Sequence, residues 1–132
     1  MSKSVSKHIA EYLAEDSSLG LTIGTDLFVD REAAKPDDTI TVFNTSGKSP
    51  ANTLSKQVYN YLAVQIRVRN TSNADAYTAI YEVIDYLNLK TNIIIDSMNY
   101  QLISLVNGPT LLDFDDNNRI RLVCNFTIQR IN

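Results

Sequence analysis

The sequence has little of what most catalytic and metal sites are built from. Its 132 residues include one cysteine, Cys124, and one histidine, His8. A single cysteine excludes an internal disulfide, so nothing indicates an oxidising compartment, and Cys124 is expected to be a small buried hydrophobe. A histidine without a second histidine or a cysteine partner is most often a surface or boundary residue, not a metal ligand or a base. Since no Ser/His/Asp or Cys/His set can be assigned, the sequence predicts a protein that is not an enzyme and holds no cofactor or metal.

Long hydrophobic runs are also missing. Lys3, Lys7, His8 and Glu11 interrupt the N-terminal region, which therefore lacks the apolar core of ~7–15 residues that a signal peptide needs. No apolar run approaches the ~20 residues of a membrane span. From these two absences we expect a cytoplasmic protein with no membrane partner. The formal net charge of −3 argues against a general nucleic-acid binder, which should show a basic excess.

What is present is the composition of an ordinary globular domain. Hydrophobic residues make up 44% of the chain and charged residues 20%, both close to average. A chain of 132 residues is long enough to bury one core and short for two. We therefore expect a single domain over residues 1–132.

The stretch from residue 59 to residue 88 predicts a strand followed directly by a helix. Within residues 59–69, apolar and polar side chains alternate as in a strand with one buried face. The apolar positions are Leu62, Val64, Ile66 and Val68. After a polar break at 70–73, apolar residues return at helical spacing, at Tyr77, Ile80, Tyr81, Ile84 and Leu87. We expect Tyr77, Tyr81 and Tyr86 to pack in the core.

The rest of the chain completes a helix-and-sheet pattern. A first amphipathic helix is expected over residues 3–15, and further strands over 26–30, 39–45, 100–106 and 119–131, with a short buried piece at 92–95. Turns are expected at 35–38, 107–109 and 115–118, and a long polar loop at 44–57. The predicted fold class is α+β: a mainly antiparallel sheet with two amphipathic helices packed on one face.

Two segments imitate ligand-binding motifs without completing them. Residues 47–49 (Gly-Lys-Ser) resemble the end of a phosphate-binding loop, but Val42 stands where that signature needs glycine. Residues 113–117 begin like a calcium loop, but its sixth and twelfth positions hold Asn118 and Cys124 instead of glycine and glutamate. We interpret the first segment as a loop and the second as an acidic turn.

The polar faces of the two long strands carry four arginines. Arg67 and Arg69 alternate outward on one strand, and Arg119 and Arg121 on the other. If the strands are neighbours, like charges share one surface and destabilise it unless something neutralises them. Candidates are the own-chain acids Asp26, Asp30 and Glu32 or solvent, which we favour slightly, and otherwise acids of another subunit or nucleic acid.

The order of these elements resembles the tail terminator and minor capsid (head–tail joining) proteins of long-tailed bacteriophages. The resemblance rests on the helix end at 19–21, the strands at 27–30 and 40–43, the loop at 46–50, the strand at 61–69, the helix at 74–87 and the closing strand at 119–126. It covers nearly the whole chain and depends on element order, because the family has no catalytic motif to match.

The resemblance implies a structural virion protein in the phage tail or neck, assembled in the host cytoplasm. It implies a ring, expected to be a hexamer, that caps the head-proximal end of the tail tube, stops tube growth and offers a surface to the neck or connector proteins. DNA would pass through its lumen without sequence-specific binding. The 44–57 loop would meet the tube protein or the neighbouring subunit. The candidate interface or lumen residues are Lys48, Lys56, Gln65, Arg67, Arg69, Asp113, Asp115, Asp116, Arg119, Arg121 and Asn125.

A ring needs two different patches of one chain in contact. Arginines on one patch and the acids at 26–32 or 113–116 of the next copy would suit that arrangement. The alternatives are another neck or head-completion adaptor, and a small-molecule-binding or enzymatic α+β domain with Tyr59, Tyr61, Gln65 and Arg67 lining a pocket. A nucleic-acid binder comes third and would show steep salt dependence.

Overall fold

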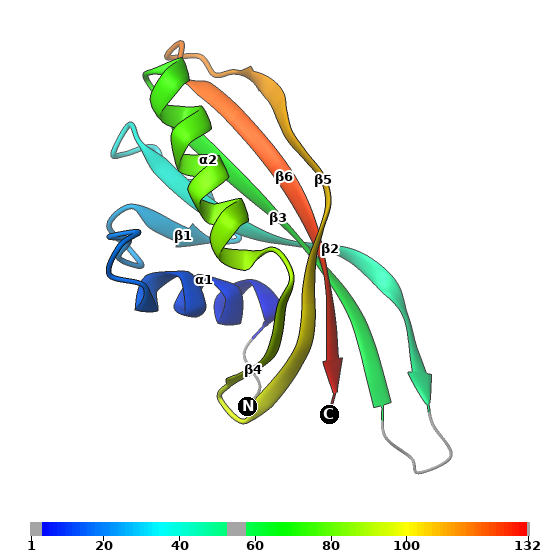
Figure 1. Ribbon diagram of the computed structural model, residues 1–132. Helices are drawn as coiled ribbons and strands as arrows, with labels where there is room; N and C mark the ends of the chain where they lie inside the picture. The colour runs from blue at the N-terminus through cyan, green and yellow to red at the C-terminus, as the bar shows by residue number, and fades with distance from the viewer. Residues whose placement is uncertain (1–3, 53–57, 132) are drawn as a thin grey trace.

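The computed structural model describes residues 4–52 and 58–131, and the side chains of residues 4–45 and 60–131. Two helices and six strands follow one another in this part of the chain (Figure 1). Their order is α1 (Val5–Glu15), β1 (Leu27–Val29), β2 (Thr39–Asn52), β3 (Val58–Asn70), α2 (Asn73–Leu87), β4 (Lys90–Ile95), β5 (Met98–Phe114) and β6 (Ile120–Ile131). The predicted α+β class is confirmed.

The six strands form one curled sheet with the spatial order β1-β2-β3-β6-β5-β4. Only the short β1–β2 pair is parallel among the described strands, and every other pair is antiparallel. β3 and β6 are direct neighbours at the centre of the sheet, as required if their arginines share a surface. The mainly antiparallel sheet is thus confirmed.

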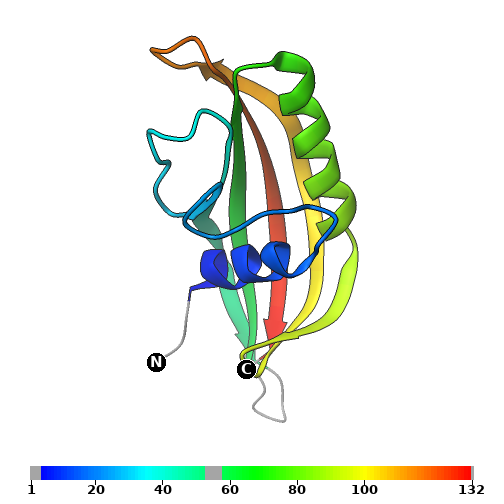
Figure 2. The ribbon, with the colours of Figure 1, turned by 90° about the vertical axis from the view of Figure 1, so that its left-hand side faces the viewer.

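Both helices lie on the same side of the sheet (Figure 2). α1 contacts β1, β2 and β3, and α2 contacts β3, β5 and β6. The sheet residues beneath them include Val64, Ile66 and Val68 of β3 and Leu122, Cys124, Phe126 and Ile128 of β6, all buried. Burial raises the pKa of the Cys124 thiol to about 12, so this cysteine is an inert hydrophobe, as expected.

The buried stripe of α2 differs from the predicted one. Ser72 caps the helix by accepting a hydrogen bond from the Asp75 amide, as serine does at this position. The buried helix residues are Ala76, Ile80, Val83, Ile84 and Leu87. The expectation that Tyr77 and Tyr81 lie in the core is wrong, because they border this stripe and are 39% and 51% exposed. Tyr86 is partly buried against the core and stacks on Tyr12.

The expectation that His8 lies at the surface or its boundary is also wrong. His8 is on the inner side of α1 and only 1% exposed. Its Nδ1 atom bonds the hydroxyl of Tyr100, which is itself fully buried on β5. A polar ring can be buried when a partner satisfies it, and that partner lies 92 residues away in the sequence.

Two expected irregular segments are strands instead. β2 continues to Asn52 and β3 begins at Val58, so most of the predicted 44–57 loop is a paired hairpin arm, and residues 53–57 lie outside the described part. Shifts of register after Thr45 and Lys48 are bulges that let this polar sequence pair through its backbone. The predicted turn at 107–109 is likewise part of β5, because Gly108 supplies a φ of +105° at a bulge opposite β6.

The predicted turn at 115–118 is confirmed, between β5 and β6. The predicted turn at 35–38 is part of a longer irregular connection between β1 and β2, in which the chain bends at 36–38. In the described part of the chain, neither helix is long and apolar enough to cross a membrane.

Candidate functional site

The polar side of β3 and β6 gathers the four arginines into one cluster. Arg69 lies opposite Arg121 in the β3–β6 register. Arg67 is two positions before Arg69 on β3, and Arg119 is two positions before Arg121, directly before β6 begins; side chains two apart share a face of a sheet. We call Arg67, Arg69, Arg119 and Arg121 the arginine cluster. It lies on the face opposite the helices, because Val68 and Ile120, which alternate with its members, are buried in the core beneath the helices.

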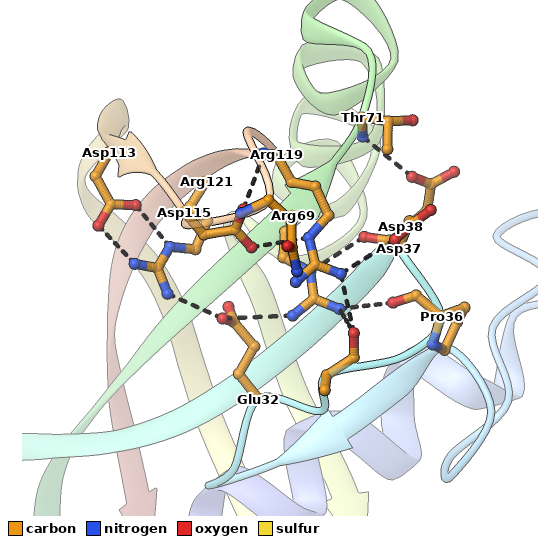
Figure 3. Close-up of polar contacts among 12 residues, drawn as sticks. Glu32, Pro36, Asp37, Asp38, Arg69, Thr71, Asp113, Asp115, Arg119 and Arg121 are labelled. Carbon is orange, nitrogen blue, oxygen red and sulfur yellow. Dashed lines mark hydrogen bonds and ion pairs between the residues drawn. The ribbon is translucent and has the colours of Figure 1, made fainter.

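Glu32 lies at the centre of the arginine cluster (Figure 3). It belongs to the connection between β1 and β2, and its side chain is 14% exposed. Its Oε1 atom is 3.0 Å from Arg121 Nη1 and 3.6 Å from Arg69 Nη1, and its Oε2 atom is 3.9 Å from Arg67 Nη1. One carboxylate thus faces three guanidinium groups, which confirms that own-chain acids neutralise this face.

The two other acids expected to do so have different partners. Asp26 accepts a hydrogen bond of 2.7 Å from the backbone amide of Thr22. Asp30 accepts hydrogen bonds from the hydroxyl of Ser6 at 3.0 Å and from the amide of Asn44 at 3.1 Å. Both carboxylates therefore organise the junction of β1, β2 and α1 instead of the arginines.

Arg121 and Asp113 form a two-pronged ion pair between β6 and β5. Arg121 Nε donates to Asp113 Oδ1 at 2.6 Å, and Arg121 Nη2 donates to Oδ2 at 2.5 Å, which is the fork geometry that makes arginine–carboxylate pairs strong. These hydrogen bonds hold the pKa of Asp113 below its usual value. They also raise the pKa of Arg121, so both partners are charged at neutral pH.

Arg119 and Asp115 close the β5–β6 turn. Arg119 Nε donates to Asp115 Oδ2 at 2.8 Å, and Asp115 Oδ1 accepts from the backbone amides of Arg119 at 2.9 Å and Asn117 at 3.0 Å. Burial works to raise the pKa of Asp115, but these hydrogen bonds outweigh it and lower the pKa. The acidic turn that imitated a calcium loop therefore has its carboxylate already occupied by donors.

Arg69 and Arg119 bind the β1–β2 connection to the sheet. Arg69 donates to the carbonyl oxygens of Pro36 at 2.6 Å and Asp37 at 3.1 Å, and Arg119 Nη1 donates to that of Ala34 at 2.9 Å. The Arg119 guanidinium also pairs with the Asp37 carboxylate at 3.2 Å. Burial, followed by the like charge of Arg119, lowers the pKa of Arg69, which still leaves an arginine protonated.

These contacts overturn the expectation that all four arginines face outward. Arg69 is 2% exposed and Arg119 is 6% exposed, because the 31–38 connection lies across them. Arg67 and Arg121 keep side-chain exposures of 23% and 22%. The four guanidinium groups face four carboxylates of the same chain, from Glu32, Asp37, Asp113 and Asp115, so this face is close to electrically neutral.

The other candidate residues are scattered around the cluster. Gln65 and Asn125 lie opposite each other on β3 and β6, with a side-chain hydrogen bond of 3.4 Å. Asp116 is exposed in the β5–β6 turn. Lys48 is in the part of β2 after residue 45, whose side chains are not described, and Lys56 lies outside the described residues.

A small cavity lies on the helix side of the sheet, where Val68 of β3 and Ala79 of α2 line it, and not at the pocket residues that the small-molecule alternative required. Its volume is about 160 Å³ and its lining includes Ile40, Val68 and Arg69. Neither Tyr61, Gln65 nor Arg67 lines it. Sites for drug-sized ligands have volumes of roughly 300–1,000 Å³, so this cavity does not favour that alternative.

The free half of β5 is a surface that the sequence reasoning missed. β4 pairs with β5 only as far as Ile103, so among the described residues one side of β5 is unpaired from residue 104 onward. This half, which we call the β5 edge, carries four exposed large apolar side chains: Val106, Leu111, Leu112 and Phe114. The run Leu-Leu-Asp-Phe at 111–114 is the sequence feature that could have predicted this surface, because exposed apolar clusters mark contact surfaces.

Comparison with known proteins adds the following. A model of the family described as "Bacteriophage tail terminator protein" matches residues 16–131. The fold is similar to that of a chain in a solved "Virion of native gene transfer agent (GTA) particle", with a TM-score of 0.70 and 14% sequence identity, covering 98% of this chain and 96% of that one. At this identity the likeness shows a shared fold. None of the curated proteins matches the sequence significantly.

Proposed function

Because this chain belongs to the bacteriophage tail terminator family, whose match covers residues 16–131, we propose that it closes the head-proximal end of a phage tail tube as a ring. Like the other members of this family, it is a structural virion protein and not an enzyme. The proposed ring is a hexamer of single-domain subunits that stops tube growth, offers its other side to neck or connector proteins and leaves a lumen for DNA. Assembly in the host cytoplasm and a place at the tail–neck junction belong to the same proposal.

Two free edges of the sheet support a ring. In a head-to-tail ring each copy presents two different patches, one to each neighbour. The β5 edge is one such patch. β1 pairs with β2 only at residues 40–42, so among the described strands the remainder of β2 has one unpaired side, on the far side of the sheet from β5. We propose that the β5 edge of one copy contacts the β2 side of the next.

The apolar character of the β5 edge supports contact with a second copy. Val106, Leu111, Leu112 and Phe114 are each 44–56% exposed, and burying such side chains supplies most of the free energy of association. An unpaired strand edge with apolar side chains is also an aggregation hazard unless another chain covers it. A ring closed on itself covers every such edge.

The charge balance of the arginine cluster is compatible with a lumen through which DNA passes. A basic wall would hold DNA through its phosphates and slow its passage. Here the guanidinium groups are matched by carboxylates of the same chain, and the formal net charge is −3. We propose that the exposed part of this face, with Gln65, Arg67, Arg121 and Asn125, borders the lumen or a ring contact. Arg69 and Arg119 serve the fold of the subunit instead.

The β2–β3 hairpin is proposed to meet the tube protein. Its described strands end at Asn52 and begin at Val58, level with the end of β6, because Tyr59 of β3 pairs with Ile131 of β6. The described part of the 44–57 segment, residues 44–52 with Lys48, therefore leads to this end of the sheet, and Lys56 lies outside the described residues.

The proposal is tested with the purified protein and with growing tail tubes. Native mass spectrometry and negative-stain imaging are expected to give a six-membered ring with a central hole. Adding that ring to polymerising tube protein should stop elongation and leave extra density at one tube end. A monomer at all concentrations, or tubes that keep growing at the usual rate, would overturn the proposal. If the ring binds neck components but leaves tube growth unchanged, the chain is a neck or head-completion adaptor, the remaining alternative.

A further inference from the structure

The single histidine belongs to a second cluster of polar side chains, on the opposite face of the sheet from the arginines. His8 and Glu11 are one turn apart on α1, a spacing that places two side chains on the same helix face. Asp96 joins them from the turn between β4 and β5. One ligand-type atom of each residue lies within 4.8 Å of the others. Because the sequence positions are far apart, only the folded chain assembles this group.

The imidazole ring is held so that one nitrogen points at the two carboxylates. Its Nδ1 atom bonds the hydroxyl of Tyr100, a residue without solvent exposure. This bond fixes the ring and leaves Nε2 as the atom that faces Glu11 and Asp96. Nε2 is buried and makes no hydrogen bond within the part of the chain that the structure describes, although Asp96 Oδ2 is 3.4 Å away. A buried ring nitrogen without a hydrogen bond calls for an explanation.

From this geometry we propose that His8, Glu11 and Asp96 bind a divalent transition-metal cation, for which Zn²⁺ is the reference. Nitrogen and oxygen ligands lie about 2.0–2.1 Å from Zn²⁺ in a tetrahedral site, which puts two such ligands roughly 3.4 Å apart. The observed distance of 3.4 Å between His8 Nε2 and Asp96 Oδ2 matches this value. Three protein ligands leave the fourth position to water.

The surroundings have two further properties of metal sites. A metal-binding histidine usually bonds an oxygen through its second nitrogen, which orients the ring, and Tyr100 occupies that position here. The site also has an entry path, because the Asp96 side chain is 51% exposed while the histidine is buried. One imidazole with two carboxylates favours Zn²⁺ or Mn²⁺ over Mg²⁺ and Ca²⁺, which prefer oxygen ligands alone.

The competing interpretation is a plain ion pair between protonated His8 and Asp96. In that case the group between His8 Nε2 and Asp96 Oδ2 is a proton carried by Nε2, and no metal ion is bound. Glu11 and Asp96 each also make another polar contact, so a metal ion must compete for both carboxylates. The two interpretations differ in measurable ways, because only the metal site involves Glu11 and takes up Zn²⁺ at one ion per chain.

The test uses the full chain without an affinity tag, stripped with EDTA and then titrated with ZnCl₂. Calorimetry and elemental analysis should give one Zn²⁺ per chain, and the melting temperature should rise by ~5 °C at saturation. Since the sequence contains one histidine, the ¹⁵N signals of its ring are unambiguous, and Nε2 is expected to shift on Zn²⁺ addition. MgCl₂ at the same concentration should produce none of these changes.

Variants at the two carboxylates decide the outcome. Asp96→Asn and Glu11→Gln are each expected to weaken Zn²⁺ binding by about tenfold or more while the chain still folds. Glu82→Gln, at an exposed position of α2, is the matched control and should bind as the parent does. No saturable uptake, an unshifted Nε2 signal, or unchanged affinity in both carboxylate variants would overturn the proposal and leave an ion pair only. None of these readouts depends on ring formation or tube capping.

Discussion

Arg69 of β3 and Arg121 of β6 are direct cross-strand partners. Two like charges at such positions destabilise a sheet, yet this pair lies on the two central strands of the sheet. The Oε1 atom of Glu32 lies 3.6 Å from Arg69 Nη1 and 3.0 Å from Arg121 Nη1. One carboxylate oxygen from the β1–β2 connection therefore pairs with both guanidinium groups and offsets their repulsion. The stability of the β3–β6 pair therefore depends on the position of the β1–β2 connection.

The first prediction concerns Glu32. The Glu32→Gln variant keeps the shape of the side chain and removes its charge, which leaves three guanidinium groups with one carboxylate fewer. We expect the free energy of unfolding to fall by about 3 kcal/mol, the range found when one partner of a largely buried ionic network is removed. Urea denaturation measures it. Glu82→Gln, exposed on α2, should change stability by less than about 0.5 kcal/mol; equal effects of the two variants would contradict the role assigned to Glu32.

The second prediction concerns the pH dependence of stability at Asp113. Hydrogen bonds from Arg121 lower the pKa of Asp113 in the folded chain, whereas the unfolded chain has a pKa of about 3.9. The contribution is therefore complete above the unfolded pKa and is lost as the pH falls from about 4 through the folded pKa. Since the Asp113 side chain is 43% exposed, solvent screening limits the effect to about 1 kcal/mol or less.

Comparing the parent with Asp113→Asn checks this prediction. Between pH 3 and pH 7, unfolding free energies of Asp113→Asn should depend less on pH than those of the parent, and the difference should shrink in ~1 M salt. Asp116→Asn, at the exposed neighbouring turn, serves as the control. If both variants show the same pH dependence, the ion pair with Arg121 does not stabilise the fold.

The arginine cluster could be predicted in part, because alternation along a strand fixes which residues share a face. The sequence alone therefore placed Arg67, Arg69, Arg119 and Arg121 together. It could not show that residues 34–37 cross this face and bury two of the arginines, because the accepting groups are backbone carbonyls. Every residue has a carbonyl, so composition does not mark the ones that are used.

The strand ends were harder to predict than the strand centres. Residues 44–52 have no apolar alternation, yet they pair with β3 through backbone groups and bulges. His8 was misplaced for a related reason, since its burial depends on Tyr100, a partner in another element. Family resemblance identified the tail terminator family because it depends on the order of elements, which is the same whether or not the ends and buried residues of each element are predicted correctly.

The third prediction concerns Gly108 on β5. A Cβ atom at this position would lie 2.8 Å from the Cα of Cys124 and 2.8 Å from the carbonyl oxygen of Val123, both backbone atoms of β6. Gly108→Ala should therefore separate the two strands locally and lower the free energy of unfolding by about 3 kcal/mol or more. Gly24→Ala is the matched control, since Gly24 also has a positive φ, of +91°, but no atom within 4 Å of the added Cβ. It should cost only the backbone strain, about 1 kcal/mol, and the same loss in both variants would contradict the close approach of β5 and β6.

The fourth prediction concerns the β5 edge, which we propose as one side of the ring contact. Val106 and Leu112 are 56% and 44% exposed, so replacing both with lysine should leave the folded subunit intact. Lysine on an open strand edge opposes pairing with another chain, and each lost apolar anchor at an interface costs about 1 kcal/mol or more. Association between subunits should weaken roughly thirtyfold or more, and native mass spectrometry should show monomers where the parent forms rings.

The control for that experiment carries two lysine substitutions at other exposed apolar residues. Tyr81 on α2 and Ile94 on β4 are 51% and 71% exposed, so the Tyr81→Lys/Ile94→Lys variant adds equal charge and removes similar apolar area away from the β5 edge. Circular dichroism and the melting temperature should match the parent for both double variants, which separates assembly from folding. If the ring survives in Val106→Lys/Leu112→Lys, or dissociates equally in the control, then the contact lies on another surface. The unpaired side of β2 would then have to bind something other than the β5 edge of a neighbouring copy.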